Sequence, residues 1–212
     1  MAEITPMMKQ YLEIKEQNKD SILFFRLGDF YEMFNEDAKL AARELDLVLT
    51  TRDRGVEDPE ARTPMCGVPY HSAEAYIARL IAKGYKVAIC EQTEDPALAK
   101  GLVKRDIIRV ITPGTVTESS MLDERRSNYI SAVYLNNGHA GIAFCDVSTG
   151  AFSATQISGA DAMQDVQNEL GSFLPSEALL GGTAAEDEPL ADLLRERFAG
   201  EWSYLSSLPH AI

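Results

Sequence analysis

Apolar runs typical of strands alternate along this chain with the apolar periodicity typical of helices, and this alternation limits its fold more than any other feature. Residues 22–27 are a β-prone apolar run with turn-forming residues on both sides, and they predict a buried strand. Residues 31–45 carry apolar side chains at three- and four-residue steps, which predicts a helix. The pattern therefore predicts an α/β fold.

The alternation continues through the first 115 residues. Thr5-Pro6 is typical of a helix start, because threonine caps helices and proline is favoured at the first helical position. The remaining predicted elements are a helix at 6–18, a strand at 47–51, a charged surface loop at 52–63, a helix at 72–83, and strands at 85–91 and 106–111. These elements predict a domain with a mixed sheet at residues 1–115.

The pattern changes after a polar connector at 116–127. Three apolar runs are separated by Asn136-Asn137-Gly138 and Ser148-Thr149-Gly150, which are signals of hairpin turns. The predicted elements are strands at 128–135, 140–147 and 151–157, a helix at 160–170, a strand at 178–180 and a helix at 190–198. We therefore expect a linker at 116–127 and a second α/β domain at 128–212.

Composition indicates an ordinary globular protein. The 212 residues are 45% hydrophobic and 25% charged. No apolar run approaches the roughly 20 residues that span a bilayer, so we expect a cytoplasmic protein without a membrane partner. Three widely spaced cysteines and three scattered histidines predict neither a disulfide framework nor a metal site.

The net charge of −13 is unevenly distributed. Residues 1–115 carry 16 Lys/Arg against 19 Asp/Glu, whereas residues 116–212 carry 4 against 14. Phosphate contacts supply much of the affinity of DNA-binding proteins, so charge alone does not predict one here. Lys100, Lys104 and Arg105 form a small basic cluster that we interpret as a solvated face.

An aromatic residue and a carboxylate stand two residues apart after the first strand, as Phe30 and Glu32. Phe30 is expected on a turn, with Asp29 as the cap of the following helix and Glu32 in its first turn. One interpretation is structural: Asp29 and Glu32 cap the helix and Phe30 belongs to the core. The other interpretation depends on the motifs elsewhere in the chain.

Five motifs occur in order along the chain. They are Thr5-Pro6-Met7-Met8, Gly28-Asp29-Phe30-Tyr31-Glu32-Met33-Phe34, Pro64-Met65-Cys66-Gly67-Val68-Pro69-Tyr70-His71, Cys90-Glu91-Gln92 and Thr112-Pro113-Gly114-Thr115. Together they closely resemble the N-terminal region of the MutS family of DNA mismatch repair proteins. The similarity runs from about residue 5 to residue 157 and weakens beyond it.

The resemblance implies a mismatch-recognition domain followed by a connector domain of RNase H-like fold, here expected to be truncated. It implies a parent protein with a C-terminal ATPase that uses ATP and Mg²⁺, yet this chain has no GxxxxGK[ST] phosphate loop. This chain is therefore expected to be a DNA-binding fragment and no enzyme, with no cofactor of its own. The implied partners are mismatched double-stranded DNA and a MutL-type protein at the connector, with a homodimeric parent and a monomeric fragment.

Within the family, the phenylalanine of a Phe-x-Glu motif inserts at the mispaired base and the glutamate hydrogen-bonds that base. The resemblance assigns these roles to Phe30 and Glu32. Expected backbone and groove contacts around them are Arg52, Pro64, Met65, Gly67, Val68, Pro69, His71 and Ser72. The alternative for Gly67-Val68-Pro69 is a tight loop required only for folding.

Two other functions compete with DNA binding. Asp146 ends a predicted strand, where an RNase H-type nuclease places its first metal-binding aspartate. Such an enzyme needs several carboxylates around two metal ions, and the next helix offers Asp161, Asp165 and Glu169 at helical spacing, which is also typical of a solvated acidic face. A fragment that only binds other proteins is the third possibility.

Overall fold

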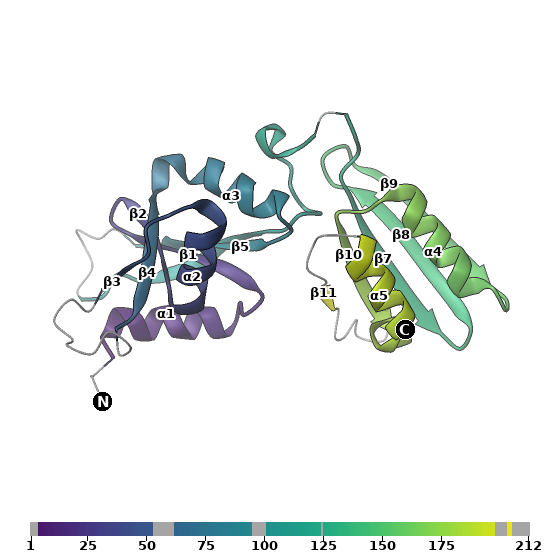
Figure 1. Ribbon diagram of the computed structural model, residues 1–212, viewed down its shortest axis with the longest axis horizontal. Helices are drawn as coiled ribbons and strands as arrows, with labels where there is room; N and C mark the ends of the chain where they lie inside the picture. Colours follow the sequence, from purple (N-terminus) through teal and green to yellow (C-terminus); the bar gives the residue numbers. More distant parts are fainter. Residues whose placement is uncertain (1–3, 53–61, 95–100, 124, 198–202, 205–212) are drawn as a thin grey trace. The chain divides into compact units, whose positions relative to one another are not determined.

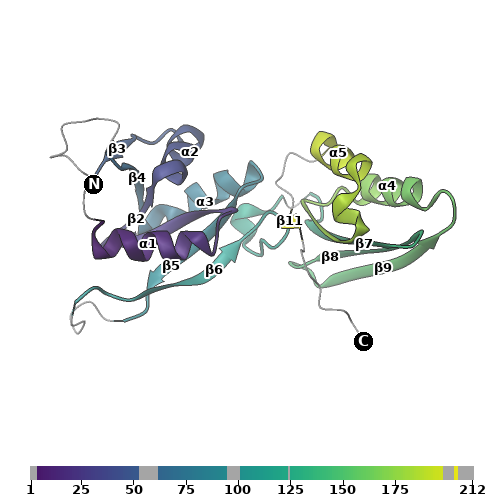
Figure 2. The same ribbon diagram turned by 90° about the horizontal axis from the view of Figure 1, so that it is seen from below.

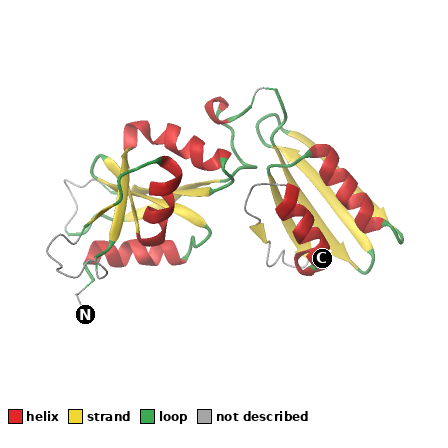
Figure 3. Ribbon diagram, in the orientation of Figure 1, coloured by secondary structure: helices red, strands yellow, loops and turns green. Residues whose placement is uncertain are grey.

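The computed structural model describes residues 4–52, 62–94, 101–123, 125–197 and 203–204 (Figure 1). The chain forms two compact units, Met1–Ile111 and Thr112–Ile212. Each unit combines helices with one sheet, as the colours of Figure 3 show. The predicted α/β class is confirmed.

The first unit contains a six-stranded mixed sheet in the order β3-β4-β2-β1-β5-β6. Only β1 and β5 run parallel, and the other neighbouring strands are antiparallel. The strands are β1 (Ser21–Leu27), β2 (Phe30–Phe34), β3 (Thr50–Thr51), β4 (Pro64–Pro69), β5 (Lys86–Gln92) and β6 (Arg105–Ile111).

Helix α1 (Pro6–Glu16) covers one face of this sheet. It begins as its sequence predicts, because the Thr5 hydroxyl accepts a hydrogen bond from the Met8 amide at 3.3 Å and Pro6 follows the cap. The Tyr11 ring meets Phe25 and Phe34 edge to face, at centroid distances of 5.4 and 4.9 Å. Burial of these rings holds α1 on the sheet.

Helices α2 (Asn35–Leu45) and α3 (Ala73–Ala82) pack against the other face. The α2 helix contacts β2 and β4, and the Cys66 thiol on β4 reaches the Ala38 carbonyl at 3.4 Å. The α3 helix contacts β4 and β5 and is preceded by a short 3-10 turn, Tyr70–Ser72. Gly84, with φ +88°, follows α3 as its predicted stop.

The prediction of a helix at 31–45 is wrong in its first part. Residues 30–34 form strand β2, and α2 begins only at Asn35. Asp29 is therefore not the helix cap and Glu32 is not in its first turn; the capping position is Phe34, which makes no side-chain capping hydrogen bond. Pairing with β1 and β4 on both sides stabilises β2 against the helical pattern.

Two further predictions around this strand need correction. The strand expected at 47–51 is limited to Thr50–Thr51. The segment Pro64–Pro69, for which no strand was predicted, is strand β4 and pairs with both β3 and β2. The charged loop predicted at 52–63 lies mostly outside the described residues, which end at 52 and resume at 62.

The second unit has a five-stranded sheet in the order β11-β10-β7-β8-β9. Strands β7, β8 and β9 form the predicted antiparallel meander, and β10 and β11 add parallel strands, an arrangement that agrees with the predicted RNase H-like connector. The strands are β7 (Tyr129–Asn136), β8 (His139–Asp146), β9 (Ala151–Ser158), β10 (Glu177–Gly182) and β11 (Ser203–Tyr204).

Helices α4 (Ala162–Phe173) and α5 (Glu188–Arg197) lie on one face of the second sheet (Figure 2). The buried core between them includes Val133, Ile142, Phe144, Leu170 and Leu190. None of the helices in the described ranges is both long and apolar enough to cross a membrane.

The segment that precedes the meander packs within the second unit. The buried Glu177 carboxylate accepts hydrogen bonds from the Thr112 hydroxyl and, at 3.2 Å, from the Gly114 amide. A Cβ at Gly114 would lie 2.8 Å from the Glu177 Cβ, so this position leaves room only for glycine. The domain limits 1–115 and 128–212 and the linker 116–127 stay predictions.

Candidate nucleic-acid interface

A tight hairpin turn positions the start of β2. Gly28 and Asp29 connect Leu27 of β1 to Phe30 of β2, and these two residues are direct partners across the ladder. Gly28 has φ +57°, a conformation that glycine adopts without steric cost and that matches the twist of a two-residue hairpin. Phe30 is therefore the first residue of a strand and does not lie on the turn.

Strand geometry places Phe30 and Glu32 on the same face, because side chains alternate along β2. Phe30 is 46% exposed, which is high for so large an apolar side chain in a central strand. Tyr31 and Met33 point to the opposite face and are buried. The structural interpretation of Phe30 as a core residue is thus wrong, and the two residues of the motif form a pair on the surface.

The carboxylate of Glu32 lies in a half-buried position beside one cation. Its side chain is 21% exposed, and the Arg52 Nη1 lies 3.4 Å from the Glu32 Oε2. Burial raises the pKa of Glu32 above its usual value, and the charge of Arg52 opposes this shift. Glu32 therefore takes up a proton more readily than an exposed glutamate does.

Strand β4 lies next to this pair and leaves space beside it. Gly67 is the direct partner of Glu32, and Pro69 is the direct partner of Phe30. A Cβ at Gly67 would lie 3.2 Å from the Tyr31 carbonyl oxygen and 3.5 Å from the Glu32 Cγ. Because Gly67 has no side chain, the Glu32 side chain lies close to the β4 backbone.

The other predicted contacts are placed differently. Val68 pairs with Tyr31 on the opposite face and is fully buried, so its side chain does not reach a groove, and that prediction is corrected. Met65 packs partly against the core under α1. Pro64 is half-buried at the start of β4.

At the other end of β4, His71 is exposed and stacks on Tyr70 at a centroid distance of 5.9 Å. The Ser72 hydroxyl donates to the Pro69 carbonyl at 3.2 Å, and Ser72 makes no side-chain cap to α3. The expected DNA contact at Ser72 therefore involves a hydroxyl that already has a partner.

Comparison with known proteins decides the family. Residues 5–120 match MutS domain I, and residues 128–201 match MutS domain II. The chain belongs to the MutS family. It is 58% identical over 198 residues to the DNA mismatch repair protein MutS of Acetivibrio thermocellus, a match that covers 93% of this chain and 22% of that relative.

Two other relatives named DNA mismatch repair protein MutS give similar values. The protein of Ruminiclostridium cellulolyticum is 56% identical over 93% of this chain and 22% of its own length. The protein of Clostridium novyi is 55% identical over 92% of this chain and 21% of its own length. This MutS chain thus spans about a fifth of the length of these relatives.

The nuclease alternative for this MutS chain depends on Asp146, which is the last residue of β8 and pairs with Ala151 of β9. Asp146 is 1% exposed, and its Oδ1 accepts hydrogen bonds from the Ser148 amide at 3.0 Å, the Ser148 hydroxyl at 2.6 Å and the Thr149 amide at 3.3 Å. These hydrogen bonds lower the pKa of Asp146, with the Ser148 hydroxyl as the largest cause. The carboxylate closes the hairpin between β8 and β9 and does not face an open site.

No group of three or more potential metal ligands occurs among the residues whose positions are described. Asp161 and Asp165 are exposed on or beside α4, as expected of a solvated acidic face. The His139 Nδ1 lies 2.8 Å from the Ser158 hydroxyl. Among the described residues of the second unit, the nuclease alternative therefore lacks the converging carboxylates that it requires.

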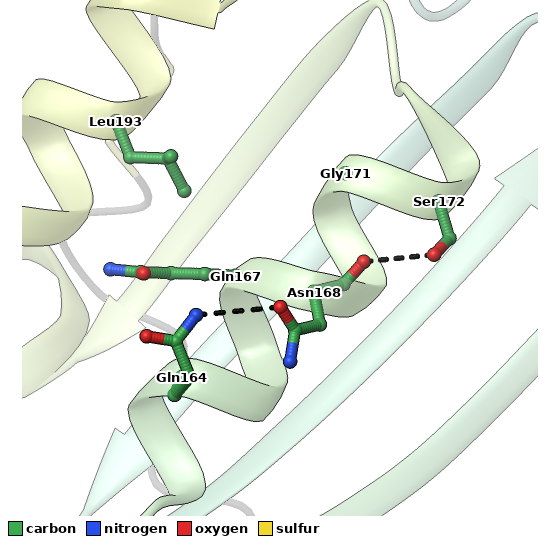
Figure 4. Close-up of a pocket in the computed structure, with 6 residues that line it drawn as sticks. All are labelled: Gln164, Gln167, Asn168, Gly171, Ser172 and Leu193. Atoms are coloured by element: carbon green, nitrogen blue, oxygen red, sulfur yellow. Dashed lines mark hydrogen bonds between the residues drawn. The ribbon is translucent and has the colours of Figure 1, made fainter.

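A polar groove lies between α4 and α5 (Figure 4). Its lining residues are Gln164, Gln167, Asn168, Gly171, Ser172 and Leu193. None of these six residues is charged, and the Gln164 and Asn168 side chains hydrogen-bond each other at 3.4 Å. The groove gives no indication of phosphate or metal binding.

Within the expected basic surface cluster, Lys104 is exposed as predicted, whereas the prediction for Arg105 is corrected. Arg105 is 7% exposed and donates to the Arg26 carbonyl at 2.7 Å, the Val103 carbonyl at 2.9 Å and the Gln10 side chain at 3.1 Å. Burial lowers the pKa of Arg105, although it stays a cation. Arg105 is thus part of the core of the first unit, and Lys100 lies outside the described residues.

One exposed aromatic side chain was missed in the sequence. Tyr70 is 46% exposed, lies at the end of β4 next to Pro69, and stacks under the Arg26 guanidinium at 3.7 Å. It belongs to the same motif as Gly67 and His71, so its position in the motif was the available signal.

Proposed function

We propose that this chain recognises mismatched double-stranded DNA in DNA mismatch repair, as the N-terminal part of a longer MutS protein. The observation that carries the proposal is the shared face of Phe30 and Glu32 at the start of a central strand, one exposed and the other half-buried with a raised pKa. In this proposal Phe30 inserts at the mispaired base, and Glu32 hydrogen-bonds that base.

The energetics of stacking favour insertion of Phe30 at a mismatch. Opening a base step costs a few kcal/mol and costs least where pairing is already faulty. An aromatic platform recovers roughly 1–3 kcal/mol for each base stacked on it. A ring that is already 46% exposed loses little protein packing when it moves against a base. The free energy of inserting Phe30 is therefore most favourable at the base steps that open most easily.

The raised pKa of Glu32 suits it to a damaged pair. An ionised carboxylate is repelled by the phosphates and finds few free donors on an intact duplex, which disfavours binding to sound DNA. A mispaired base offers an unpaired ring nitrogen, which donates to ionised Glu32 or accepts a proton from its acid form. Burial stabilises the acid form, and Arg52 at 3.4 Å stabilises the ionised form, so both states are accessible.

Groups around the pair would orient the DNA without reading its sequence. Arg52 is exposed and cationic, Gly67 lets the backbone approach closely, and Pro69 lies beside Phe30 on the same face. Met65, Pro64, His71 and Ser72 would contribute further groove and backbone contacts from the ends of β4. Val68 would contribute only through its backbone, because its side chain is buried.

The properties of the whole protein extend this proposal. We propose that the longer protein is a homodimer that binds ATP and Mg²⁺ through a C-terminal domain, acts in the cytoplasm, and contacts a MutL-type protein through the second unit. The acidic second half, with 4 Lys/Arg against 14 Asp/Glu, suits a protein contact better than a DNA contact. The 212-residue chain alone should be monomeric and bind DNA weakly, because it is acidic overall.

Cross-linking tests the assignment of Phe30 directly. A photoreactive phenylalanine analogue is placed at position 30 of the longer protein and irradiated with duplexes that carry, or lack, one G·T mismatch. We expect preferential labelling of the mismatched duplex at the mispaired step. The same analogue at Phe152, which is 68% exposed in the second unit, serves as the control. Equal labelling of both duplexes through position 30 would reject the assignment.

A further inference from the structure

Four side chains form a cluster on the face of the first sheet opposite to Phe30 and Glu32. They are Arg26, Tyr31, Tyr70 and Glu91, and they are called the Arg26 cluster here. Arg26 on β1 is the direct partner of Tyr31 on β2, and Glu91 follows Cys90, the partner of Phe25, on β5. Three of the four thus form a row across three neighbouring strands.

Arg26 is the centre of the cluster. Its Nη1 lies 3.3 Å from the Glu91 Oε1, and the Tyr31 hydroxyl donates to the same carboxylate oxygen. Its Nε donates to the Gly28 carbonyl at 2.6 Å, so the side chain also reaches the hairpin turn. The Cζ of its guanidinium lies 3.7 Å from the centroid of the Tyr70 ring, a cation–π contact. One side chain therefore connects β5, the turn and the end of β4.

Tyr70 also holds the turn through its backbone. Pro69 pairs with Phe30 but has no N–H, so it cannot donate to the ladder at that position. The next residue supplies a hydrogen bond instead, from the Tyr70 amide to the Asp29 carbonyl at 2.9 Å. The Gly28–Asp29 turn is thus held by the Arg26 side chain at Gly28 and by the Tyr70 amide at Asp29.

Burial makes these contacts stronger than those of an ordinary surface pair. The Arg26 and Glu91 side chains are 16% and 26% exposed, and Tyr31 as a whole is 7% exposed. Burial, reinforced by the hydrogen bond to Glu91, raises the pKa of Tyr31 to about 12. Tyr31 therefore keeps its proton and remains a donor throughout the physiological pH range.

We propose that the Arg26 cluster is a positioning device for the recognition hairpin: it fixes Tyr31 and the Gly28–Asp29 turn, so that Phe30 and Glu32 project from β2 in one defined direction. Tyr31 lies between Phe30 and Glu32 in the chain. When its side chain is anchored on one face of the sheet, the positions of Phe30 and Glu32 on the opposite face are also fixed. The inference rests on the proposed role of Phe30 and Glu32.

The direction of the side chain matters because Phe30, which is proposed to insert into a base step, stands directly after a short hairpin turn. A ring that is already held in its binding orientation loses less conformational entropy on binding. Groups that contact a ligand keep their geometry when a supporting set of packed and hydrogen-bonded residues holds them. None of the four residues in the cluster needs to touch DNA for this role.

Hydrogen exchange of the 212-residue chain tests the positioning role without DNA. The variant Tyr31→Phe removes only the hydroxyl that donates to Glu91. Loss of a hydrogen bond to a charged group corresponds to roughly tenfold faster exchange, which we expect at the Tyr70 amide and along β2. Exchange in β7–β9 should be unchanged. Tyr134→Phe, the same change at a half-exposed tyrosine of the second unit, should leave the Tyr70 amide unaffected.

A second variant, Arg26→Lys, tests whether the effect of Tyr31→Phe involves the whole cluster and not only the lost hydroxyl. Arg26→Lys keeps a positive charge near Glu91 but loses the planar stack on Tyr70 and the Nε donor to Gly28. It should accelerate exchange at Tyr70 at least as much as Tyr31→Phe does. Glu91→Gln retains an acceptor for Tyr31 and should have a smaller effect than Glu91→Ala. Exchange that matches the unsubstituted chain in both Tyr31→Phe and Arg26→Lys would overturn the proposal.

Binding by the longer protein then separates the positioning role from the proposed function. Affinities for G·T and fully paired duplexes are measured for Tyr31→Phe, Arg26→Lys and Phe30→Ala. We expect a partial, several-fold loss of discrimination in the first two. If they discriminate normally while Phe30→Ala does not, the positioning role is wrong and the function stands. If Phe30→Ala discriminates normally, the function is wrong, and the exchange data alone decide whether the cluster fixes the hairpin.

Discussion

Glu32 and Asp146 are both carboxylates close to a hairpin turn, yet their surroundings are opposite. Asp146 is 1% exposed and accepts three hydrogen bonds from the turn that it closes, which lower its pKa. Glu32 is half-buried with Arg52 at 3.4 Å, and burial raises its pKa. The turn residues satisfy Asp146, whereas Glu32 keeps hydrogen-bonding capacity for a ligand.

The contrast shows why a carboxylate after a strand does not by itself indicate a site. Backbone amides and hydroxyls nearby in the sequence compete with any ligand for its oxygens. Ser148 and Thr149 do so for Asp146, whereas the ladder partner of Glu32 is Gly67 of β4, which has no side chain. The following changes test this contrast.

The largest effect should come from Asp146→Ala, which leaves the amides of Ser148 and Thr149 without their acceptor. Loss of a buried hydrogen-bond partner of this kind should lower the free energy of unfolding of the second unit by about 2–3 kcal/mol. Urea unfolding of the 212-residue chain, followed by circular dichroism, measures it. Asp161→Ala, at an exposed position, should change stability by less than about 0.5 kcal/mol. Equal stability of the two variants would contradict the structural role of Asp146.

Phe30→Ala should have a large effect on binding and a small one on folding. Loss of one stacked aromatic, worth roughly 1–3 kcal/mol, should reduce mismatch discrimination about tenfold or more. Titration of the longer protein with G·T and fully paired duplexes gives the ratio of affinities. Phe152→Ala removes an aromatic ring that is 68% exposed and should leave the ratio unchanged. An unchanged ratio in Phe30→Ala would show that the ring does not sense the mismatch.

The two carboxylates should give the two units opposite dependences on pH. The pKa of Asp146 is lowered by folding, so its contribution to stability is present above the usual pKa of aspartate and is lost as the pH falls through the folded value. The pKa of Glu32 is raised, so its contribution is present below the usual pKa of glutamate and is lost as the pH rises through the folded value.

Asp146→Asn should therefore reduce the loss of stability that the second unit shows as the pH falls. Glu32→Gln should remove the loss of stability that the first unit shows as the pH rises. It should leave the first unit slightly more stable at neutral pH. Unfolding measured between about pH 3 and pH 7, where both carboxylates titrate, gives the two profiles. Profiles that move in the same direction in both variants would contradict the contrast.

Gly67→Ala should have the smallest effect. The new Cβ would meet the Tyr31 carbonyl oxygen at 3.2 Å and the Glu32 Cγ at 3.5 Å, so β2 and β4 must shift by a few tenths of an ångström. We expect a loss of stability below about 1 kcal/mol and weaker mismatch discrimination, because the added methyl group crowds Glu32. Gly141→Ala is the matched control, since a Cβ there meets nothing within 4 Å. Identical behaviour of the two variants would mean that the space beside Glu32 is unimportant.

Local patterns predicted the fold where they agreed with the tertiary structure. Helix α1 follows from its threonine cap and proline, and the meander of the second unit follows from its hairpin signals. Strand β2 was missed because it has five residues and runs directly into α2, so its alternation merged with the helical period. Strand β4 was missed because of its prolines, but Pro64 and Pro69 stand at its two ends, where they interrupt few ladder hydrogen bonds.

The sequence named residues that the structure brings together around β2, but not the face of the sheet on which each side chain lies. The motif resemblance named Phe30, Glu32 and Gly67, which the ladder brings together. It could not assign Val68 to the buried face, because that depends on the register with β2. Arg105 was misplaced because its partners, such as Gln10, are far away in the sequence and are not charged. Contacts of this kind become visible only once the sheet is assembled.

The alternation of β2 makes the length of the hairpin critical. Inserting or deleting one residue between Phe30 and Phe34 would exchange the two faces of the strand, turning Phe30 inward and exposing a residue that now belongs to the interior. Natural variants of this segment should therefore change in composition but not in residue number, and any tolerated extension should occur at the Gly28–Asp29 turn. The number of residues between Phe30 and Glu32 is therefore constrained, and sequencing of the functional variants in an insertion library would reveal this constraint.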